Sequence, residues 1–302
     1  MTQIDFDLSF EPRHGEAVEL APGLSRITVN NPSHFTFHGT NSYLIGTDRL
    51  AVVDPGPIDD DHYEALIRAI AGRPVGHILI THTHRDHSPL AQRLKAESGA
   101  LIVAQGPHRF ARDLALGETN PLDAAADTGL VPDIALGDGE SVEAGGMDIV
   151  AVHTPGHTGN HAAFALGDTG ILLSGDHVMG WSTSIVAPPD GSMIDYMASL
   201  DKLASRDDRI YFPGHGGPVA NPQAFVRALR AHRKMREMAI LQRIRKGDRT
   251  IPEIVATIYR DVDPRLHGAA GLSVFAHIED LVGRGLVVTD GAPMLDGVFT
   301  PA

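Results

Sequence analysis

The sequence contains no cysteine among its 302 residues. This absence excludes disulfides, thiolate metal ligands and cysteine nucleophiles together, so any metal ion must be held by histidine and carboxylate side chains. Basic residues are also scarce, with 25 against 38 acidic residues and a formal net charge of -13. Because non-specific binding to nucleic acid depends on a cationic surface, we do not expect a protein that coats nucleic acid.

Long hydrophobic runs are missing as well. The amino terminus has neither a basic segment followed by an apolar run nor an arginine-rich transit pattern, and no later apolar stretch is long enough to cross a bilayer. We therefore expect a cytoplasmic protein with no membrane contact. Hydrophobic residues still make up 42% of the chain, which is enough for the core of one large domain, alone or with a small one.

Strand and helix patterns are mixed through the first 220 residues or so. Short apolar, β-branched runs predict strands in residues 24–54, and residues 61–72 have the spacing of a helix. Later apolar runs, such as residues 77–81 and 170–175, end directly in polar turns. This alternation predicts a layered α/β fold in which helices cover sheets.

The pattern changes after Pro222. The segment from Arg227 to Arg249 carries nine basic residues against two acidic ones and has no strand signal, which fits a solvated helix face or a surface that tracks phosphates. Capping-box spacing predicts a helix that begins at Thr250, and apolar spacing predicts a second helix over residues 273–285. A hairpin is expected around residues 290–291. We therefore predict a first domain at 1–221 and a winged-helix-like domain at 222–302.

The 17 histidines are grouped, and the densest group follows an apolar strand. His82 and His84 lie two residues apart, so on an extended chain they point the same way and can converge on one ion. Asp86 and His87 lie in the following turn and can face a neighbouring ion. Three further strand ends each deliver one candidate ligand at a turn, namely His157, Asp176 and His215. Any one could be an ordinary turn residue, but together they predict loops that converge on a metal site at one sheet edge.

These motifs read THTHRDH, HTPGHT, SGD and PGHG, and in this order they resemble the metallo-beta-lactamase superfamily over about the first 220 residues. The resemblance implies an αββα sandwich and a dinuclear site. It places His82, His84 and His157 on one metal, Asp86, His87 and His215 on the other, and Asp176 as a bridge. The chain is most similar to a branch of winged-helix-tailed proteins that includes a mitochondrial endoribonuclease. It departs from the usual pattern at Ser88-Pro89-Leu90, where a Gly-Gly pair is common, and at Asn160, where that branch often has Asp.

Imidazole and carboxylate ligands suit zinc, so we expect two zinc ions per chain, although manganese or iron would also fit these ligands. Such a site stays cationic and supplies a metal-bound hydroxide that can attack a carbonyl or phosphoryl centre. Asp86 and Asp176 are accordingly predicted to serve catalysis as well as metal binding. Hydrolysis of a phosphodiester, a thioester or a lactone remains open.

Three functions therefore compete. The leading hypothesis is a dinuclear hydrolase of a phosphodiester, with single-stranded RNA slightly favoured because of the tail. The second is a small-molecule thioester or lactone hydrolase of the glyoxalase II kind. The third is a winged-helix nucleic-acid-binding regulator with a structural metal site, although residues 273–285 lack the polar cluster expected of a base-reading helix. The sequence leaves the substrate, the native metal and a possible homodimer open.

Three residues outside the ligand set are singled out. Asp54 is expected to orient a ligand histidine through its second ring nitrogen, as the resemblance also implies. His161 could touch substrate or support a ligand. Trp181 could line the substrate cleft or belong to the core.

Overall fold

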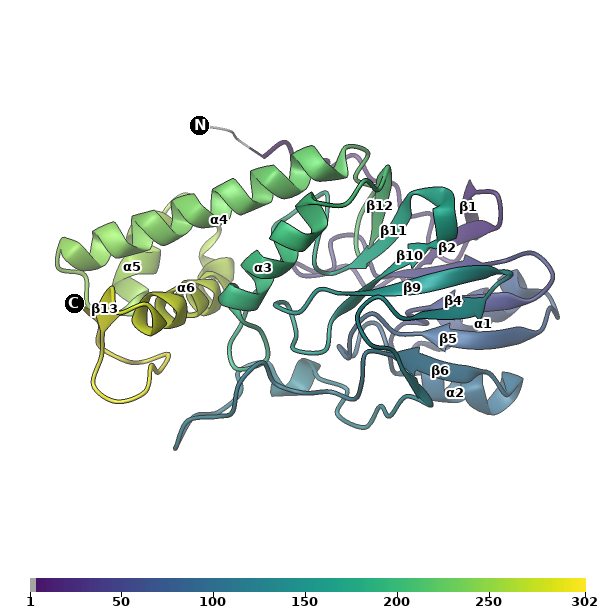
Figure 1. Cartoon of the computed structure of the whole chain (residues 1–302), viewed down its shortest axis with the longest axis horizontal. Helices are drawn as coiled ribbons and strands as arrows, with labels where there is room; N and C mark the ends of the chain where they lie inside the picture. Colours follow the sequence, from purple (N-terminus) through teal and green to yellow (C-terminus); the bar gives the residue numbers. More distant parts are fainter. Residues whose placement is uncertain (1–3) are drawn as a thin grey trace.

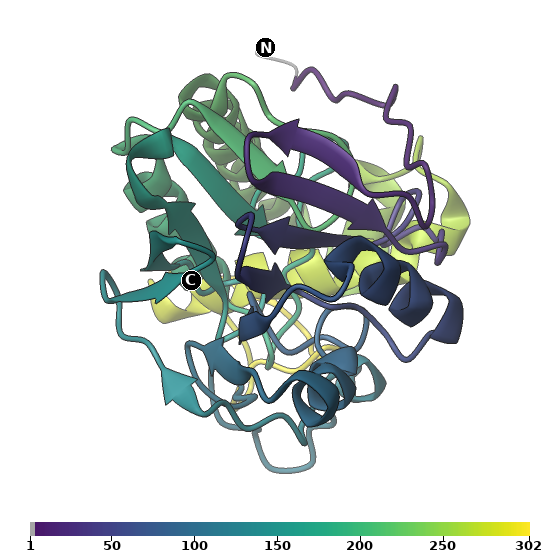
Figure 2. The ribbon, with the colours of Figure 1, turned by 90° about the vertical axis from the view of Figure 1, so that its right-hand side faces the viewer.

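The computed structural model describes residues 4–302, which form two sheets packed face to face, with a helical region at one end (Figures 1 and 2). The first sheet keeps chain order: β1 (Val18–Ala21), β2 (Leu24–Thr28), β3 (Asn41–Ile45), β4 (Leu50–Val53), β5 (Val75–Leu79), β6 (Leu101–Ala104) and β7 (Ile134–Ala135). The second sheet has the order β12 (Ile210–Pro213), β11 (Ile171–Gly175), β10 (Ala162–Leu166), β9 (Met147–His153) and β8 (Ser141–Ala144). Both sheets are mixed, because β4 to β7 run parallel and β11 runs parallel to β12.

Apolar side chains fill three layers. Between the sheets, Val53 and Leu79 belong to one cluster with Phe164 and Leu173. Helices α1 (Asp60–Ile70) and α2 (Leu90–Ser98) cover the outer face of the first sheet, and α3 (Met193–Ala204) and α4 (Pro222–Arg245) cover that of the second (Figure 1). The predicted αββα sandwich is therefore confirmed. Short 3-10 turns lie at Asp123–Ala125, Gly167–Thr169 and Pro264–Leu266.

The carboxyl-terminal part contains α5 (Ile251–Ile258), α6 (His267–Gly283) and a wing of β13 (Val287–Val288) and β14 (Thr300–Pro301). The Glu253 carboxylate accepts a hydrogen bond from the Thr250 backbone N–H at 2.9 Å, as the capping-box spacing predicted. The predicted hairpin is only partly right, because a loop over residues 289–299 joins the strands in place of a turn at residues 290–291. Pro293 lacks the N–H that a continuing ladder would need, and fully buried Phe299 anchors the returning chain.

Helix α4 belongs to two cores. Val226 and Leu229 pack with α3 and the second sheet, whereas Ile240 and Ile244 pack with α5 and α6. One helix thus links the sandwich to the winged-helix region, and the domain boundary at residue 221 stays a prediction. Among the described residues, no helix has both the length and the apolar character needed to cross a bilayer.

Candidate metal centre

The predicted ligands come together at one edge of the sandwich. They lie in the loops that follow β5, β9, β11 and β12, which are the strand ends picked out from the sequence. All of them are buried except Asp86, whose side chain is 28% exposed. Strands β11 and β12 are neighbours, and the N–H of Gly214 donates to the carbonyl of Gly175 at 2.9 Å, which places Asp176 beside His215.

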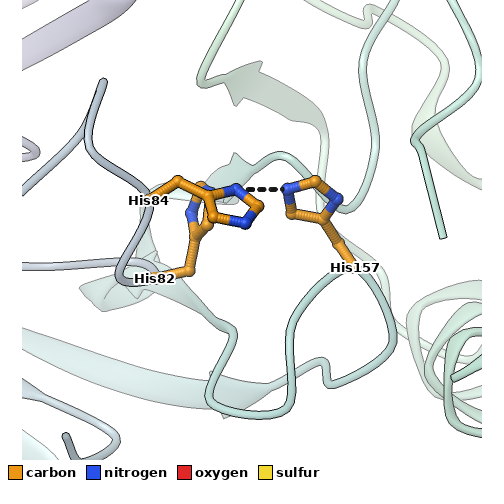
Figure 3. Close-up of side chains that lie close together, drawn as sticks. All are labelled: His82, His84 and His157. Atoms are coloured by element: carbon orange, nitrogen blue, oxygen red, sulfur yellow. Dashed lines mark hydrogen bonds between the residues drawn. The ribbon is translucent and has the colours of Figure 1, made fainter. Parts of the chain in front are cut away.

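Three histidines form the first group of the cluster (Figure 3). The Nε2 atoms of His82 and His157 lie 3.1 and 3.0 Å from Nδ1 of His84. Tetrahedral coordination with zinc–nitrogen bonds of 2.0–2.1 Å would place two such nitrogens roughly 3.3 Å apart. The three rings therefore have the spacing of a shared metal ion.

Asp86, His87 and His215 form the second group. Nε2 of His215 lies 3.2 Å from Oδ2 of Asp86 and 3.3 Å from Nε2 of His87. Oδ2 of Asp176 lies between the two groups, 3.2 Å from Nε2 of His215 and 3.7 Å from Nε2 of His157. The geometry is that expected of a bridging carboxylate.

The surroundings of Asp176 fit a bound cation. Its Oδ1 atom is buried and has no hydrogen-bond partner within the described part of the chain, which is costly unless a ligand supplies one. A Cβ at Gly214 would clash with this oxygen and with Cε1 of His87. Nitrogen and oxygen donors in this set suit zinc, and also manganese or iron.

Electrostatics differ between the two groups. Burial lowers the pKa of His157 to about 4, so this ring is neutral and ready to bind a metal. Burial also acts against a charged His215, but Asp176 and Asp86 outweigh it and raise its pKa to about 9. Burial would raise the pKa of Asp176, yet His215 and His87 hold it well below its usual range. A metal ion held by the second group would therefore take the place of the protons that His215 and His87 otherwise carry.

Hydrogen bonds behind the ligands fix their orientation. Oδ2 of Asp54 lies 3.0 Å from Nδ1 of His87, which is the placement predicted for Asp54. The same carboxylate accepts from the N–H of Thr81 at 2.8 Å, so it is itself held in place. His161 is fully buried, and its Nε2 accepts from the N–H of Asp176 at 3.1 Å. His161 thus supports the Asp176 loop and does not face substrate.

The sequence interpretation missed Asp190. Its Oδ2 lies 3.3 Å from Nε2 of His84, and its Oδ1 lies 3.8 Å from Nε2 of His108. Asp190 therefore orients His84 much as Asp54 orients His87. The signal was present in the rigid Pro-Pro-Asp-Gly turn at 188–191, which presents a single acidic side chain.

A cavity of about 290 Å³ opens over the cluster. Apart from the ligands, its walls are mainly apolar side chains, namely Phe35, Leu122, Ala125, Met179 and Ile185. Leu122 and Ala125 come from the long connection between β6 and β7, to which the sequence analysis assigned no role. Trp181 does not line this cavity; it stacks on Phe37, with ring centroids 4.8 Å apart.

Four of the nine basic residues in the stretch from Arg227 to Arg249 are buried or paired with acids. Arg233 is buried and donates to the carbonyl oxygen of Ser184. Several others form ion pairs with acidic neighbours: Arg230 with Asp201, Lys234 with Glu237, and Arg243 with Asp248. The interpretation of this stretch as a phosphate-tracking surface is therefore weaker than the sequence suggested.

Comparison with known families agrees with this site. The profile of the metallo-beta-lactamase superfamily matches residues 35–215, and that of the beta-lactamase associated winged helix domain matches residues 250–294. The chain belongs to the metallo-beta-lactamase superfamily. It carries the associated winged-helix domain at its carboxyl-terminal end, as the sequence predicted.

The chain is similar to several known proteins over most of its length. The beta-lactamase-like protein 2 homolog of Drosophila melanogaster is 28% identical over 283 residues, covering 88% of this chain and 92% of that protein. An atrochrysone carboxyl ACP thioesterase of Cryptosporiopsis is 26% identical over 264 residues, covering 80% of this chain and 74% of that protein. A metallo-beta-lactamase family protein of Thermus thermophilus superposes with a TM-score of 0.76 at 27% identity, covering 94% of this chain and 100% of that one.

Proposed function

We propose that this superfamily member is a dinuclear, zinc-dependent hydrolase of acyl thioesters. The observation that carries the substrate class is the wall of the cavity over the metal cluster, where Phe35, Leu122, Met179 and Ile185 offer apolar surface for an acyl chain. No lysine or arginine of the described chain lines this cavity, so a string of phosphates would find no cation beside the reacting centre. Relatives that carry thioesterase names, such as the Cryptosporiopsis protein, support the same reaction class.

In this proposal the seven predicted ligands hold two cations, with Asp176 between them. When bound, these ions would polarise the thioester carbonyl and lower the pKa of a water molecule. Asp54 and Asp190 keep His87 and His84 in the orientation that binding requires. The apolar walls exclude bulk water and position the acyl group.

Phosphodiester hydrolysis is the alternative that the sequence favoured slightly. Its main support was the cationic stretch from Arg227 to Arg249. Because Arg233 is buried and Arg230 and Lys234 are paired with acids, that stretch supports a surface for RNA less well than expected. In a lactone, as in a thioester, the hydroxide would attack an acyl carbonyl carbon. Lactone hydrolysis would therefore use the same chemistry as the proposed reaction.

The test is a direct comparison of substrates. Zinc-loaded protein should be assayed at equal concentration on an acyl thioester, an acyl lactone and single-stranded RNA. We expect the thioester to give a kcat/KM at least tenfold above that of the lactone, with no RNA cleavage. RNA cleavage without thioester hydrolysis would overturn the proposal.

A further inference from the structure

A second cavity, of about 280 Å³, adjoins the one over the metals. The two share Phe35 and Ile185 in their walls, so the second space lies directly beside the first, on the other side of these two side chains. Helices α4 and α6 line its far side, together with Tyr259 from the end of α5 (Figure 1). The winged-helix region therefore contributes to a space that adjoins the cavity over the metal cluster.

Arg233 places a buried positive charge in the wall of this second cavity. Only 3% of the residue is exposed, and its Nε has no hydrogen-bond partner among residues 4–302. None of the ion pairs between described residues includes Arg233; its guanidinium donates to the carbonyl oxygen of Ser184 and lies 5.1 Å from the ring centre of Tyr196, but it has no counter-ion. A buried charge is costly when it is unpaired, and an anionic ligand would remove that cost.

Arg236 lines the same cavity one helical turn further along α4. Its guanidinium lies over the ring of Tyr259, 4.6 Å from the ring centre, and it pairs with no carboxylate in the described chain. The wall includes no acidic residue but offers the hydroxyls of Thr183 and Ser273 as further donors. His232 lines the cavity as well, and burial, followed by the charges of Arg233 and Arg236, lowers its pKa to about 4.

We propose that this basic cavity, lined by Arg233, Arg236, Thr183 and Ser273, binds a phosphate monoester on the thiol side of the thioester substrate. Two guanidinium groups match the two charges of a phosphate monoester, and the Arg236 group can donate a pair of hydrogen bonds to its oxygens. The acyl carbon then lies at the metals and the phosphate lies between α4 and α6. This inference rests on the proposed thioester hydrolysis and names the part of the substrate that the enzyme selects.

The first test compares S-acetyl-4′-phosphopantetheine with S-acetylpantetheine, which differ only in the phosphate. We expect the parent enzyme to prefer the phosphorylated thioester by at least tenfold in kcat/KM, mainly through KM. Arg236→Gln should lose this preference, whereas Arg227→Gln, which changes an exposed residue of the same helix, should keep it. An S-acetyl thioester of glutathione is the carboxylate counterpart, and an equal preference for it would overturn the phosphate assignment.

The second test does not need turnover. 4′-Phosphopantetheine should bind chelator-treated protein in a calorimetric titration, and Arg236→Gln should weaken that binding at least tenfold. Binding that depends on Arg236 in a protein without thioesterase activity would support the cavity and overturn the proposed function. Thioester hydrolysis with no preference for phosphate and no effect of Arg236→Gln would overturn the cavity and leave the proposed function standing. Arg233→Lys is informative only if it folds, so Arg236 is the deciding variant.

Discussion

The backbone N–H of Asp176 donates to Nε2 of His161 over 3.1 Å, inside the sandwich. Nε2 can accept only if the ring is neutral with its proton on Nδ1, and Nδ1 then donates to the hydroxyl of Thr154, 2.8 Å away. Burial holds the pKa of His161 well below its ordinary value, which keeps this form. A histidine outside the predicted ligand set thus holds the loop that carries Asp176.

This contact makes His161→Phe informative. The substitution leaves the buried N–H of Asp176 without an acceptor, which costs about 1–3 kcal/mol in the free energy of unfolding. We expect that loss in urea titrations, together with weaker metal binding. His161→Gln restores an acceptor and should recover part of both. If Phe and Gln behave alike, the hydrogen bond has no such role.

Asp176→Ala should change metal content as well as activity. We expect elemental analysis to find about two metal equivalents in the parent, because the predicted ligands are too many for one tetrahedral ion. The variant should hold about one and lose most turnover, since the negative charge between two cations is gone. Asp168→Ala, at an exposed turn, is the control. Two retained equivalents would rule out a bridging role.

Asp54→Asn and Asp190→Asn should act on different metals. Loss of such an orienting carboxylate typically costs about 10–100-fold in metal affinity. Because Asp54 contacts His87 and Asp190 contacts His84, we expect Asp54→Asn to weaken the ion held with Asp86 and His215, and Asp190→Asn the three-histidine ion. Competition with a chromophoric chelator separates the two affinities. Equal effects on both would contradict this assignment.

His277 of α6 should make the protein sensitive to acid. It is 1% exposed, and neither ring nitrogen has a hydrogen-bond partner within residues 4–302. Burial, and next the charge of Arg233, hold its pKa well below 6.5, so below pH 6.5 the unfolded chain takes up a proton that the folded chain does not. Stability from the neutral ring is therefore present above pH 6.5 and is lost as the pH falls.

His277→Leu should remove this loss. The stability advantage of the variant over the parent should grow by about 1.4 kcal/mol per pH unit below pH 6.5. Urea unfolding of both proteins at pH 7.5 and 5.5 measures it, and comparing them at each pH cancels other titrations that they share. A constant difference between the two pH values would show that His277 takes up its proton in the folded state.

Local signals predicted the ligand cluster well. Turn residues such as Pro155, Gly156 and Gly214 follow apolar strands, so the sequence indicates both the strand ends and the side chains they present. The loops converge because β9, β11 and β12 run in the same direction and end, together with β5 of the other sheet, at one edge of the sandwich. Which residues would share a metal was implied by the resemblance alone and stays a prediction.

Contacts between distant segments could not be predicted in the same way. Asp190 reaches His84 across 106 positions of sequence, and Arg233 is buried although the sequence of its helix is polar and basic. Exposure of an arginine depends on what packs over the helix, and neither composition nor periodicity reports that. The wing was misjudged for a local reason, since Asp290-Gly291 has turn chemistry but the chain pairs only after residue 299.

Helix α4 packs in both hydrophobic cores, so the winged-helix region cannot be removed without exposing part of this helix. Melting of α5 and α6 would strip the partners from Ile240 and Ile244 and fray the helix toward Arg233 and Arg236. The second cavity, which α4 and α6 line, would then lose its walls. We therefore expect loss of the winged-helix region to disrupt the cavity lined by Arg233 and Arg236, although that region holds none of the predicted metal ligands.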